Sequence, residues 1–182
     1  MREGERQRKK ILAISGSIRE SSSNTRILTA ATKMFADEFN TEVFNGLKDL
    51  PFFDPGLQEE EKPPSVLTFI EKIASADAVI FCTPEYVFSL PGILKNALEW
   101  TVSTTVFSYK PVAFIIASAS GEKAFESLDT ILRTLVQEDI PADRKLLIRG
   151  GQGQINEAGE FIDALTLEKV RSVILAVVAQ VT

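Results

Sequence analysis

The stretch from Ile11 to Arg26 constrains the fold of this chain more than any other part of the sequence. It joins a short apolar run, Ile11 to Ile14, to a loop rich in serine and then to the beginning of a helical pattern. An apolar run without polar alternation is typical of a strand buried on both faces, as in a parallel sheet. We therefore expect a strand, a polar loop and a helix in direct succession.

The polar loop offers many hydrogen-bond donors. Its hydroxyls, an arginine and several backbone N–H groups come together where the next helix adds unpaired N–H groups and a partial positive charge. A phosphate dianion suits such a place, but neither Gly-x-Gly-x-x-Gly nor Gly-Lys-Ser/Thr occurs here. Two interpretations remain open: a phosphate site made mainly of neutral donors, or an ordinary N-cap supplied by Ser22, Ser23 or Asn24.

The rest of the chain alternates between short apolar runs and helical periodicity. This alternation predicts a doubly wound α/β fold with a five-stranded parallel sheet and helices on both faces. The expected strands are 10–15, 41–45, 78–82, 111–117 and 145–148. The expected helices are 23–40, 65–75, 91–100, 123–138 and 162–179. Residues 149–159 are rich in Gly and Gln and are expected to form an exposed loop or a turn that contacts a partner.

Length and composition favour one domain of an ordinary globular protein. The chain has 182 residues and a net charge of −5, which argues against nucleic acid as its main partner. No apolar run is long enough to span a bilayer, and residues 1–9 form a polar tail without the features of a signal peptide. We expect one domain over residues 10–182, no membrane partner and a cytoplasmic location.

The missing and rare residue types exclude several kinds of chemistry. The chain has no histidine, which rules out a His-based triad and argues against a transition-metal site. Its single cysteine, Cys82, rules out an intrachain disulfide and is interpreted as a small core residue. This composition is poor for hydrolysis and compatible with redox chemistry that a cofactor carries.

A second motif follows the third expected strand, and together the two motifs resemble those of the NADPH-dependent FMN reductase family. The first motif of that family reads Gly-Ser-x-Arg-x-x-Ser-x-Asn, and here it consists of Gly16, Ser17, Arg19, Ser22 and Asn24. The second motif here consists of Pro84, Glu85, Tyr86, Pro91, Leu94, Lys95, Asn96, Ala97, Glu99 and Trp100. The resemblance spans residues 9–180 and implies the flavodoxin-like strand order 2-1-3-4-5. In that order the two motifs meet where ligands of such sheets bind.

The resemblance implies FMN as the cofactor and assigns its phosphate to the first loop. The residues expected to bind the phosphate are Ser17, Arg19, Ser22 and Asn24, with Ser15 and Thr25 as further donors. In the family the arginine can also lie toward the flavin edge and attract NADPH, and a solvated surface arginine is the third interpretation of Arg19.

Two further loops are expected to hold the ribityl chain and the ring. The second loop acts chiefly through backbone groups of Pro84, Glu85, Tyr86 and Val87. After the fourth strand, the third loop offers Ser118, Ser120 and Gly121, for which helix capping is an equally good explanation.

The chain departs from the family pattern in two places. Many members have Asn and then Gly or His after the tyrosine, whereas this chain has Val87 and Phe88. The third loop lacks a glycine pair. Both changes bear on substrate preference more than on flavin binding.

The resemblance implies an FMN-dependent oxidoreductase that passes electrons from NADPH (or NADH) to a small acceptor such as a quinone, azo compound, chromate or flavin. No side chain need act as a catalytic acid or base, because FMN carries the chemistry. A homodimer or homotetramer is expected. The alternatives are a non-enzymatic electron carrier of the flavodoxin type and a binding module on the same fold.

Overall fold

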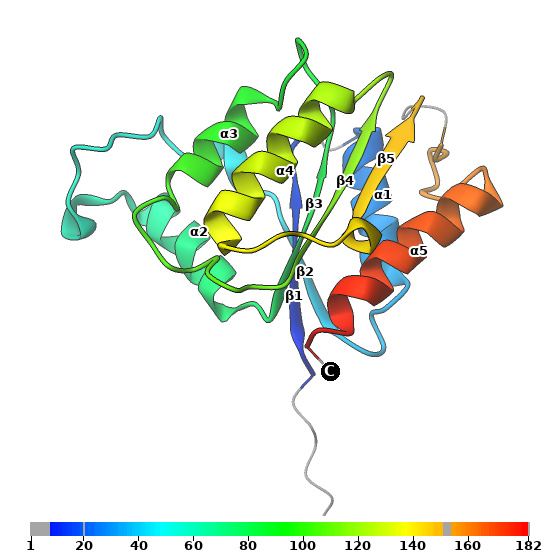
Figure 1. Ribbon diagram of the computed structural model, residues 1–182, viewed down its shortest axis with the longest axis horizontal. Coiled ribbons are helices and arrows are strands. Elements are labelled where there is room, and N and C mark those ends of the chain that lie inside the picture. The colour runs from blue at the N-terminus through cyan, green and yellow to red at the C-terminus, as the bar shows by residue number, and fades with distance from the viewer. Residues whose placement is uncertain (1–7, 20, 151–153, 182) are drawn as a thin grey trace, which may run out of the picture.

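One parallel sheet of five strands forms the centre of the molecule (Figure 1). The computed structural model describes residues 8–19, 21–150 and 154–181. The strands are β1 (Lys10–Ser15), β2 (Asn40–Phe44), β3 (Ala78–Thr83), β4 (Val112–Ser118) and β5 (Lys145–Arg149). Their order, β2-β1-β3-β4-β5, confirms the predicted topology. It places β1 beside β3, with Ser15 in register with Cys82, so the loops that follow these strands start side by side.

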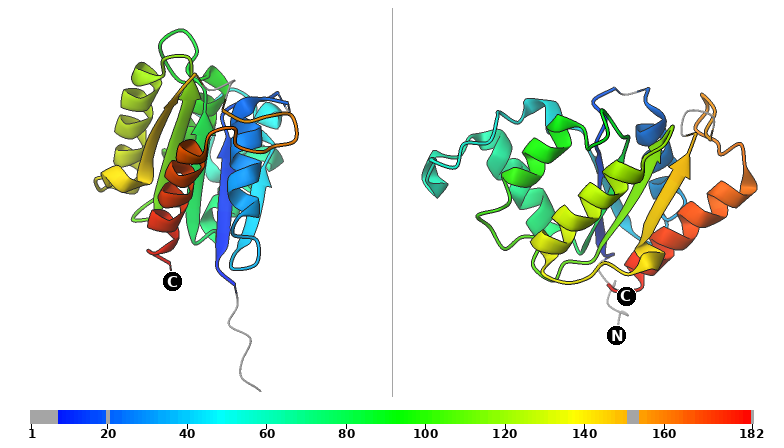
Figure 2. Two further views of the ribbon diagram at one scale, coloured as in Figure 1. Left: turned by 90° about the vertical axis from the view of Figure 1, so that its right-hand side faces the viewer. Right: turned by 45° about the horizontal axis from the view of Figure 1, so that its top comes forward.

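Helices cover both faces of the sheet (Figure 2). The α-helices are α1 (Ser23–Lys33), α2 (Pro64–Ser75), α3 (Gly92–Glu99), α4 (Glu122–Val136) and α5 (Ala164–Val178). Short 3₁₀ turns lie at η1 (Leu47–Asp49), η2 (Glu59–Glu61) and η3 (Ala142–Arg144). One face carries α2, α3 and α4, and the other carries α1 and α5.

Alternation along the strands divides the core into two layers. In β1, Leu12 and Ile14 face the layer under α2, α3 and α4, whereas Ile11 and Ala13 face the layer under α1 and α5. Successive side chains of a strand point to opposite faces, so both sets are apolar only when both faces are covered. Every residue of β3 is buried, which explains its unbroken apolar sequence.

The first helix is shorter than the predicted 23–40. It ends at Lys33, and Asn40 already belongs to β2, where its N–H donates to the carbonyl oxygen of Lys9. The apolar periodicity continued because Phe35 and Phe39 remain buried in the turns between the two elements. Periodicity therefore reported burial correctly and helix length wrongly.

Other boundaries differ from prediction by a few residues for local reasons. Pro91 is the N-cap of α3 and not its first residue, and Asp163 caps α5, so that helix begins at Ala164 and not at 162. The segment 149–159 is not simply exposed: Arg149 ends β5, and Ile155 is buried and bridges to Phe161. Residues 151–153 of this predicted loop and residues 1–7 of the predicted tail lie outside the described residues.

Two side chains of the second motif, Asn96 in α3 and Trp100 at its C-cap, tie that helix to the loop before α2. Asn96 and Trp100 both donate to the carbonyl oxygen of Pro51, each at 2.9 Å, and Asn96 accepts from the Phe53 N–H at 2.8 Å. Trp100 is buried against the edge of the Phe53 ring. These residues therefore hold α3 against the loop that precedes α2. Among the described residues, no helix combines the length and apolar character needed to cross a membrane.

Candidate functional site

A pocket of about 330 Å³ opens at the carboxyl edge of the sheet, where the loops after β1, β3, β4 and β5 meet. The predicted site residues that line it are Ser17, Arg19, Ser22, Asn24, Pro84, Glu85, Tyr86 and Ser118. The lining residues that sequence reasoning missed are Ser23, Ala117, Ala119 and Gly150. All four are small: Ser23 begins α1, Ala117 lies in β4, and Ala119 and Gly150 directly follow β4 and β5. Only Ser23 had been singled out, as a possible N-cap.

Gly16 allows the first two loops to approach each other closely. Its N–H donates to the carbonyl oxygen of Cys82 at 2.8 Å. A Cβ at this position would lie 2.0 Å from the hydroxyl oxygen of Thr83 and 2.5 Å from the Thr83 Cβ. Only glycine fits there without moving β3. The glycine of the first motif thus sets the distance between the two walls of the pocket.

Three hydroxyls form a cluster beneath the first loop. The Thr25 hydroxyl is 3.0 Å from that of Ser15 and 2.8 Å from that of Ser22. Ser22 is the N-cap of α1 and accepts from the Thr25 N–H at 3.1 Å. Of the two interpretations of this loop, phosphate site or N-cap, the side chain of Ser22 follows the N-cap one. Ser15 and Thr25 line a smaller neighbouring pocket of about 60 Å³ and do not line the main one.

The Asn24 side chain points into the protein. Its amide nitrogen donates to the Ala117 carbonyl oxygen at 3.1 Å, and its oxygen accepts from the Cys82 thiol at 3.4 Å. Burial raises the pKa of that thiol, so it stays protonated and can donate. Asn24 therefore joins α1 to the ends of β3 and β4. A ligand would meet its backbone and not its amide.

Arg26 is a second residue that joins segments around the pocket, and sequence reasoning missed it. Its guanidinium donates to the Ser21 carbonyl oxygen at 2.6 and 3.2 Å and to the Asn156 carbonyl oxygen at 3.1 Å. It thus connects the first loop with the segment between β5 and α5. Arg19, by contrast, is exposed at the pocket mouth. Its position one helical turn beyond the loop was the only sequence signal for Arg26.

The second loop contains a tight hairpin that rises above the carboxyl edge, at the top of Figure 1. Tyr86 and Ser89 exchange both backbone hydrogen bonds, at 2.9 and 3.1 Å. Between them, Val87 and Phe88 have φ values of 51° and 56°. This is the geometry of a type I′ turn, which strongly favours Asn-Gly. A valine with positive φ is strained, and here its side chain is 94% exposed.

The side chain of Glu85 reaches the third loop. Its carboxylate accepts from the Ser120 hydroxyl at 2.9 Å and from the backbone N–H groups of Lys123 and Ala124 at 2.9 and 3.0 Å. The Ala124 N–H contributes most to lowering the pKa of Glu85, and the Ser120 hydroxyl adds to that effect against the opposing effect of burial. The prediction for this loop was that it acts chiefly through backbone groups, so the side-chain role of Glu85 is new.

Gly121, the N-cap of α4, has a φ of 102° and lies outside the pocket lining. An added Cβ would lie 2.7 Å from a Leu147 methyl carbon, so both conformation and packing require glycine there. Next to it, Glu122 pairs with Arg149, with distances of 2.9 and 2.8 Å to two guanidinium nitrogens. Side-chain bonds thus link the loop after β3 to the start of α4, and the start of α4 to the end of β5.

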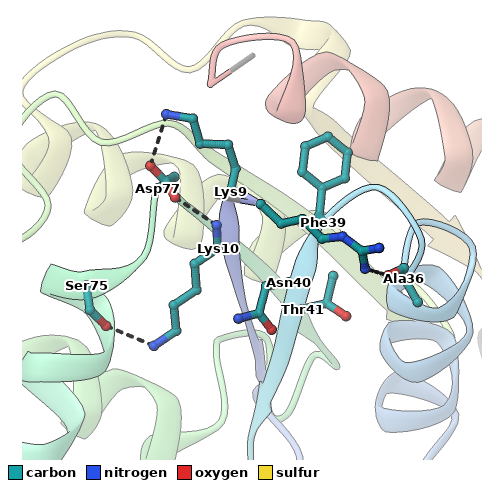
Figure 3. A pocket seen from close by; sticks show the side chains of 9 residues that line it. Lys9, Lys10, Ala36, Phe39, Asn40, Thr41, Ser75 and Asp77 are labelled. Atoms are coloured by element: carbon teal, nitrogen blue, oxygen red, sulfur yellow. Dashed lines mark hydrogen bonds and ion pairs between the residues drawn. The ribbon is translucent and has the colours of Figure 1, made fainter. Parts of the chain in front are cut away.

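A broader hollow of about 860 Å³ lies at the opposite, amino edge (Figure 3). Arg8, Lys9 and Lys10 give it a basic lining, but these groups already have partners. Lys9 pairs with Asp77, the Lys10 amine donates to Ser75, and Arg8 donates to the Ala36 carbonyl oxygen. None of the predicted site residues lies there. Within the described ranges, no cluster of three or more Cys, Asp or Glu residues could hold a metal ion.

Comparison with known proteins relates this chain to flavin-dependent reductases. Residues 9–142 match the family described as NADPH-dependent FMN reductase. An NAD(P)H-dependent FMN reductase of Pseudomonas aeruginosa is 31% identical over 166 residues, which cover 89% of each chain. The quinone reductase of Escherichia coli strain K12 is 29% identical and covers 87% of each chain.

Solved structures show the same fold. FerB, a flavoenzyme NAD(P)H:(acceptor) oxidoreductase from Paracoccus denitrificans, matches with a TM-score of 0.74 at 23% identity, over 94% of this chain and 96% of its own. An FMN-dependent NADH-azoreductase from Bacillus anthracis, solved with FMN, matches with a TM-score of 0.58 at 14% identity, over 96% of this chain and 100% of its own.

Proposed function

The chain belongs to the NADPH-dependent FMN reductase family, and from this membership and the pocket we propose that it is an FMN-dependent oxidoreductase. It takes electrons from NAD(P)H and passes them to a small acceptor. The observation that carries the proposal is the convergence of both family motifs on one pocket at the carboxyl edge. Ligands of open parallel sheets bind at this edge, where the strand order reverses.

The donor set of the pocket fits FMN in one orientation. Helix α1 begins at this pocket and α4 begins behind Glu85, which lines it; a helix N-terminus attracts an anion. The Glu85 carboxylate already occupies the N-terminus of α4. A phosphate would therefore lie at α1, beside Ser17 and Arg19, with Ser22 and Asn24 supplying the helix end. The hydroxyls of Ser15 and Thr25 support the loop from below.

The ring of FMN would then lie toward the second and third loops. Pro84, Glu85 and Tyr86 form one wall of that half of the pocket, and Ser118 and Ala119 form the other. When bound, FMN supplies the hydride-accepting centre. The chain has no histidine to act as an acid or base. Its own residues bind and orient FMN and leave one face open to NAD(P)H and the acceptor.

The remaining assignments rest on length and composition or on the family. We propose that residues 10–182 act as one domain, that the protein works in the cytoplasm, and that it forms a homodimer or homotetramer. The acceptor is a small molecule, and quinone reduction is the activity named for one of the relatives above. Neither nucleic acid nor membrane is proposed as a partner.

Anaerobic reduction tests the proposal. The protein is loaded with FMN, NADPH or NADH is added, and the visible flavin absorbance is followed. We expect rapid bleaching to the fully reduced spectrum in one two-electron phase, and recovery of the absorbance when a quinone is added. Bound FMN that fails to bleach would sink the enzyme assignment and favour the electron carrier. An Arg19→Ala variant with unchanged FMN and NADPH affinities would remove the role given to that residue.

A further inference from the structure

Helix α4 begins without a side-chain cap of its own. Its N-cap is Gly121, whose φ of 102° strains any other residue, and an added Cβ would crowd the Leu147 and Ile116 side chains at 2.7 and 3.0 Å. Most helices satisfy their first N–H groups with a Ser, Thr, Asp or Asn at this position. In α4 the acceptors for these N–H groups must come from elsewhere in the chain.

Glu85 supplies the missing cap from another loop. Its two carboxylate oxygens accept three hydrogen bonds from Ser120, Lys123 and Ala124, which lie 35 to 39 residues further along the chain. Hydrogen bonds to an ionised group are the strong ones, and the helix dipole adds to them. The carboxylate thus fastens the loop after β3 to the loop after β4, which are the two walls of the ring half of the pocket.

We propose that Glu85 is a positioning residue for the flavin ring, which it affects in two ways. The inference rests on the proposed function, since it needs FMN in this pocket. First, the three bonds fix the distance between the walls that would hold the ring. Second, a permanent negative charge stays beside the ring half of the pocket. That charge opposes the negative charge that FMN gains on reduction, so the pocket favours the oxidised cofactor relative to the reduced one.

The Glu85→Gln variant distinguishes these two effects on the flavin from a general loss of stability. The change is nearly isosteric and removes the charge. The remaining oxygen can still accept from the Lys123 and Ala124 N–H groups, and the new amide NH2 faces the Ser120 hydroxyl, which can accept, so the three bonds lose their charge assistance. We expect about tenfold weaker binding of oxidised FMN and only about threefold weaker binding of reduced FMN. The ratio of the two dissociation constants therefore shifts about threefold toward the reduced form. Fluorescence titration of oxidised FMN and anaerobic titration of reduced FMN measure both constants.

Two further variants complete the test. Glu126→Gln removes an exposed carboxylate that pairs with Lys123 on the same helix, and it should leave both dissociation constants unchanged. Glu85→Asp keeps the charge but shortens the reach, so it should weaken both forms of FMN by the same factor. If the Gln variant does not fold, wild-type affinity of the Asp variant for both forms overturns the proposal.

The outcomes also separate this inference from the proposed function. Equal weakening of both redox forms by Glu85→Gln would make Glu85 a structural cap only and would overturn its role toward the ring. Unchanged affinity for both forms would overturn the inference entirely while the FMN assignment stands. Failure of the wild-type protein to bind FMN would overturn the proposed function, and the role of Glu85 with it.

Discussion

The polar groups at the two edges of the central sheet differ in whether they have partners within the chain. At the amino edge, charges pair with one another: Asp77 accepts from the Lys10 N–H at 2.7 Å and pairs with the Lys9 amine, and the Lys110 amine donates to the Ala76 carbonyl oxygen. At the carboxyl edge, Arg19 and the backbone of the first loop face a pocket instead. The larger hollow is the amino one, so size does not identify the site.

Backbone conformation shows the same contrast. The carboxyl edge has two consecutive residues with positive φ, Val87 and Phe88, and a glycine, Gly121, that no other residue can replace without strain. The amino edge has two such residues among those described, Tyr109 before β4 and Gln137 at the end of α4, but they are not consecutive. Strain persists where the surroundings impose it, and it gathers at functional sites. The exposed Arg19 together with a strained backbone, and not cavity volume, distinguishes the carboxyl edge of this sheet.

The largest expected effect comes from adding a side chain at Gly16, where the loops after β1 and β3 approach each other. In Gly16→Ala the new methyl group overlaps the Thr83 side chain, so the two loops must separate. We expect a loss of about 3 kcal/mol in the free energy of unfolding and FMN binding at least about tenfold weaker. Urea unfolding of the FMN-free protein and fluorescence titration measure the two quantities.

Gly92→Ala is the matched control for that substitution. Gly92 lies in the first turn of α3, and a Cβ there meets no atom within 4 Å. Alanine is the better helix former, so stability should change by less than about 0.5 kcal/mol, or rise. If both alanine variants were equally stable, the close approach at Gly16 would not be what sets the pocket.

The sequence was sufficient to predict the sheet, its strand order and the place of the pocket. Apolar runs such as Ala78 to Cys82 identify doubly covered strands, and the motif spacing places both loops at one edge. The sheet depends on periodicity and chain order, which a sequence displays directly, whereas the strand order and the place of the pocket were implied by the resemblance to the reductase family. Helix ends are harder to predict, because Phe35 and Phe39 stay buried in turns after α1 has ended.

Side-chain direction could not be predicted from the motifs. Asn24 and Glu85 belong to motifs that predicted ligand contact, yet their polar atoms bond to Ala117 and to the start of α4. Each of these contacts joins segments 35 or more residues apart, so no local pattern reports it. Gly121 was the one available signal, since a helix that starts after glycine lacks a side-chain cap of its own.

A second comparison concerns the strained hairpin. Replacing Val87-Phe88 with Asn-Gly supplies the residues that a type I′ turn favours and keeps its backbone hydrogen bonds. Both original side chains are exposed, at 94% and 78%, so little packing is lost. We expect the FMN-free protein to gain about 1 kcal/mol in urea unfolding. Tyr109→Gly relieves a single strained residue at the amino edge and should gain about half as much.

A loss of stability in the Asn-Gly variant would contradict this account of the hairpin. It would mean that Val87 and Phe88 pack against something, and a second copy of the chain is the first candidate. Light scattering during size-exclusion chromatography, at two protein concentrations, would then show whether the variant dissociates where the wild-type protein does not.

The smallest expected effect is a pH dependence that compares Glu85 with Glu42 at the amino side. Hydrogen bonding to Lys72 contributes most to lowering the pKa of Glu42, and Lys10 adds to it. The pKa of Glu85 is lowered chiefly by the Ala124 N–H. A carboxylate whose pKa falls on folding stabilises the protein above its unfolded pKa of about 4.3, and this contribution disappears as the pH falls through the folded value. The free energy of unfolding should therefore fall less steeply below about pH 5 in Glu85→Gln and in Glu42→Gln than in the wild type.

Salt distinguishes the two carboxylates. Glu42 is held by lysine charges at a partly exposed site, which ions screen, whereas Glu85 is held by neutral N–H groups and a hydroxyl, with Lys123, Glu122 and Arg149 as the charges nearby. At 0.5 M NaCl the Debye length is about 4 Å, and both lysine nitrogens lie within 3.5 Å of Glu42, so the Glu42→Gln and wild-type pH curves should converge in part. The Glu85→Gln curve should stay distinct. Equal convergence of both would show that Glu85, like the amino edge, depends on ion pairing and not on the cap of α4.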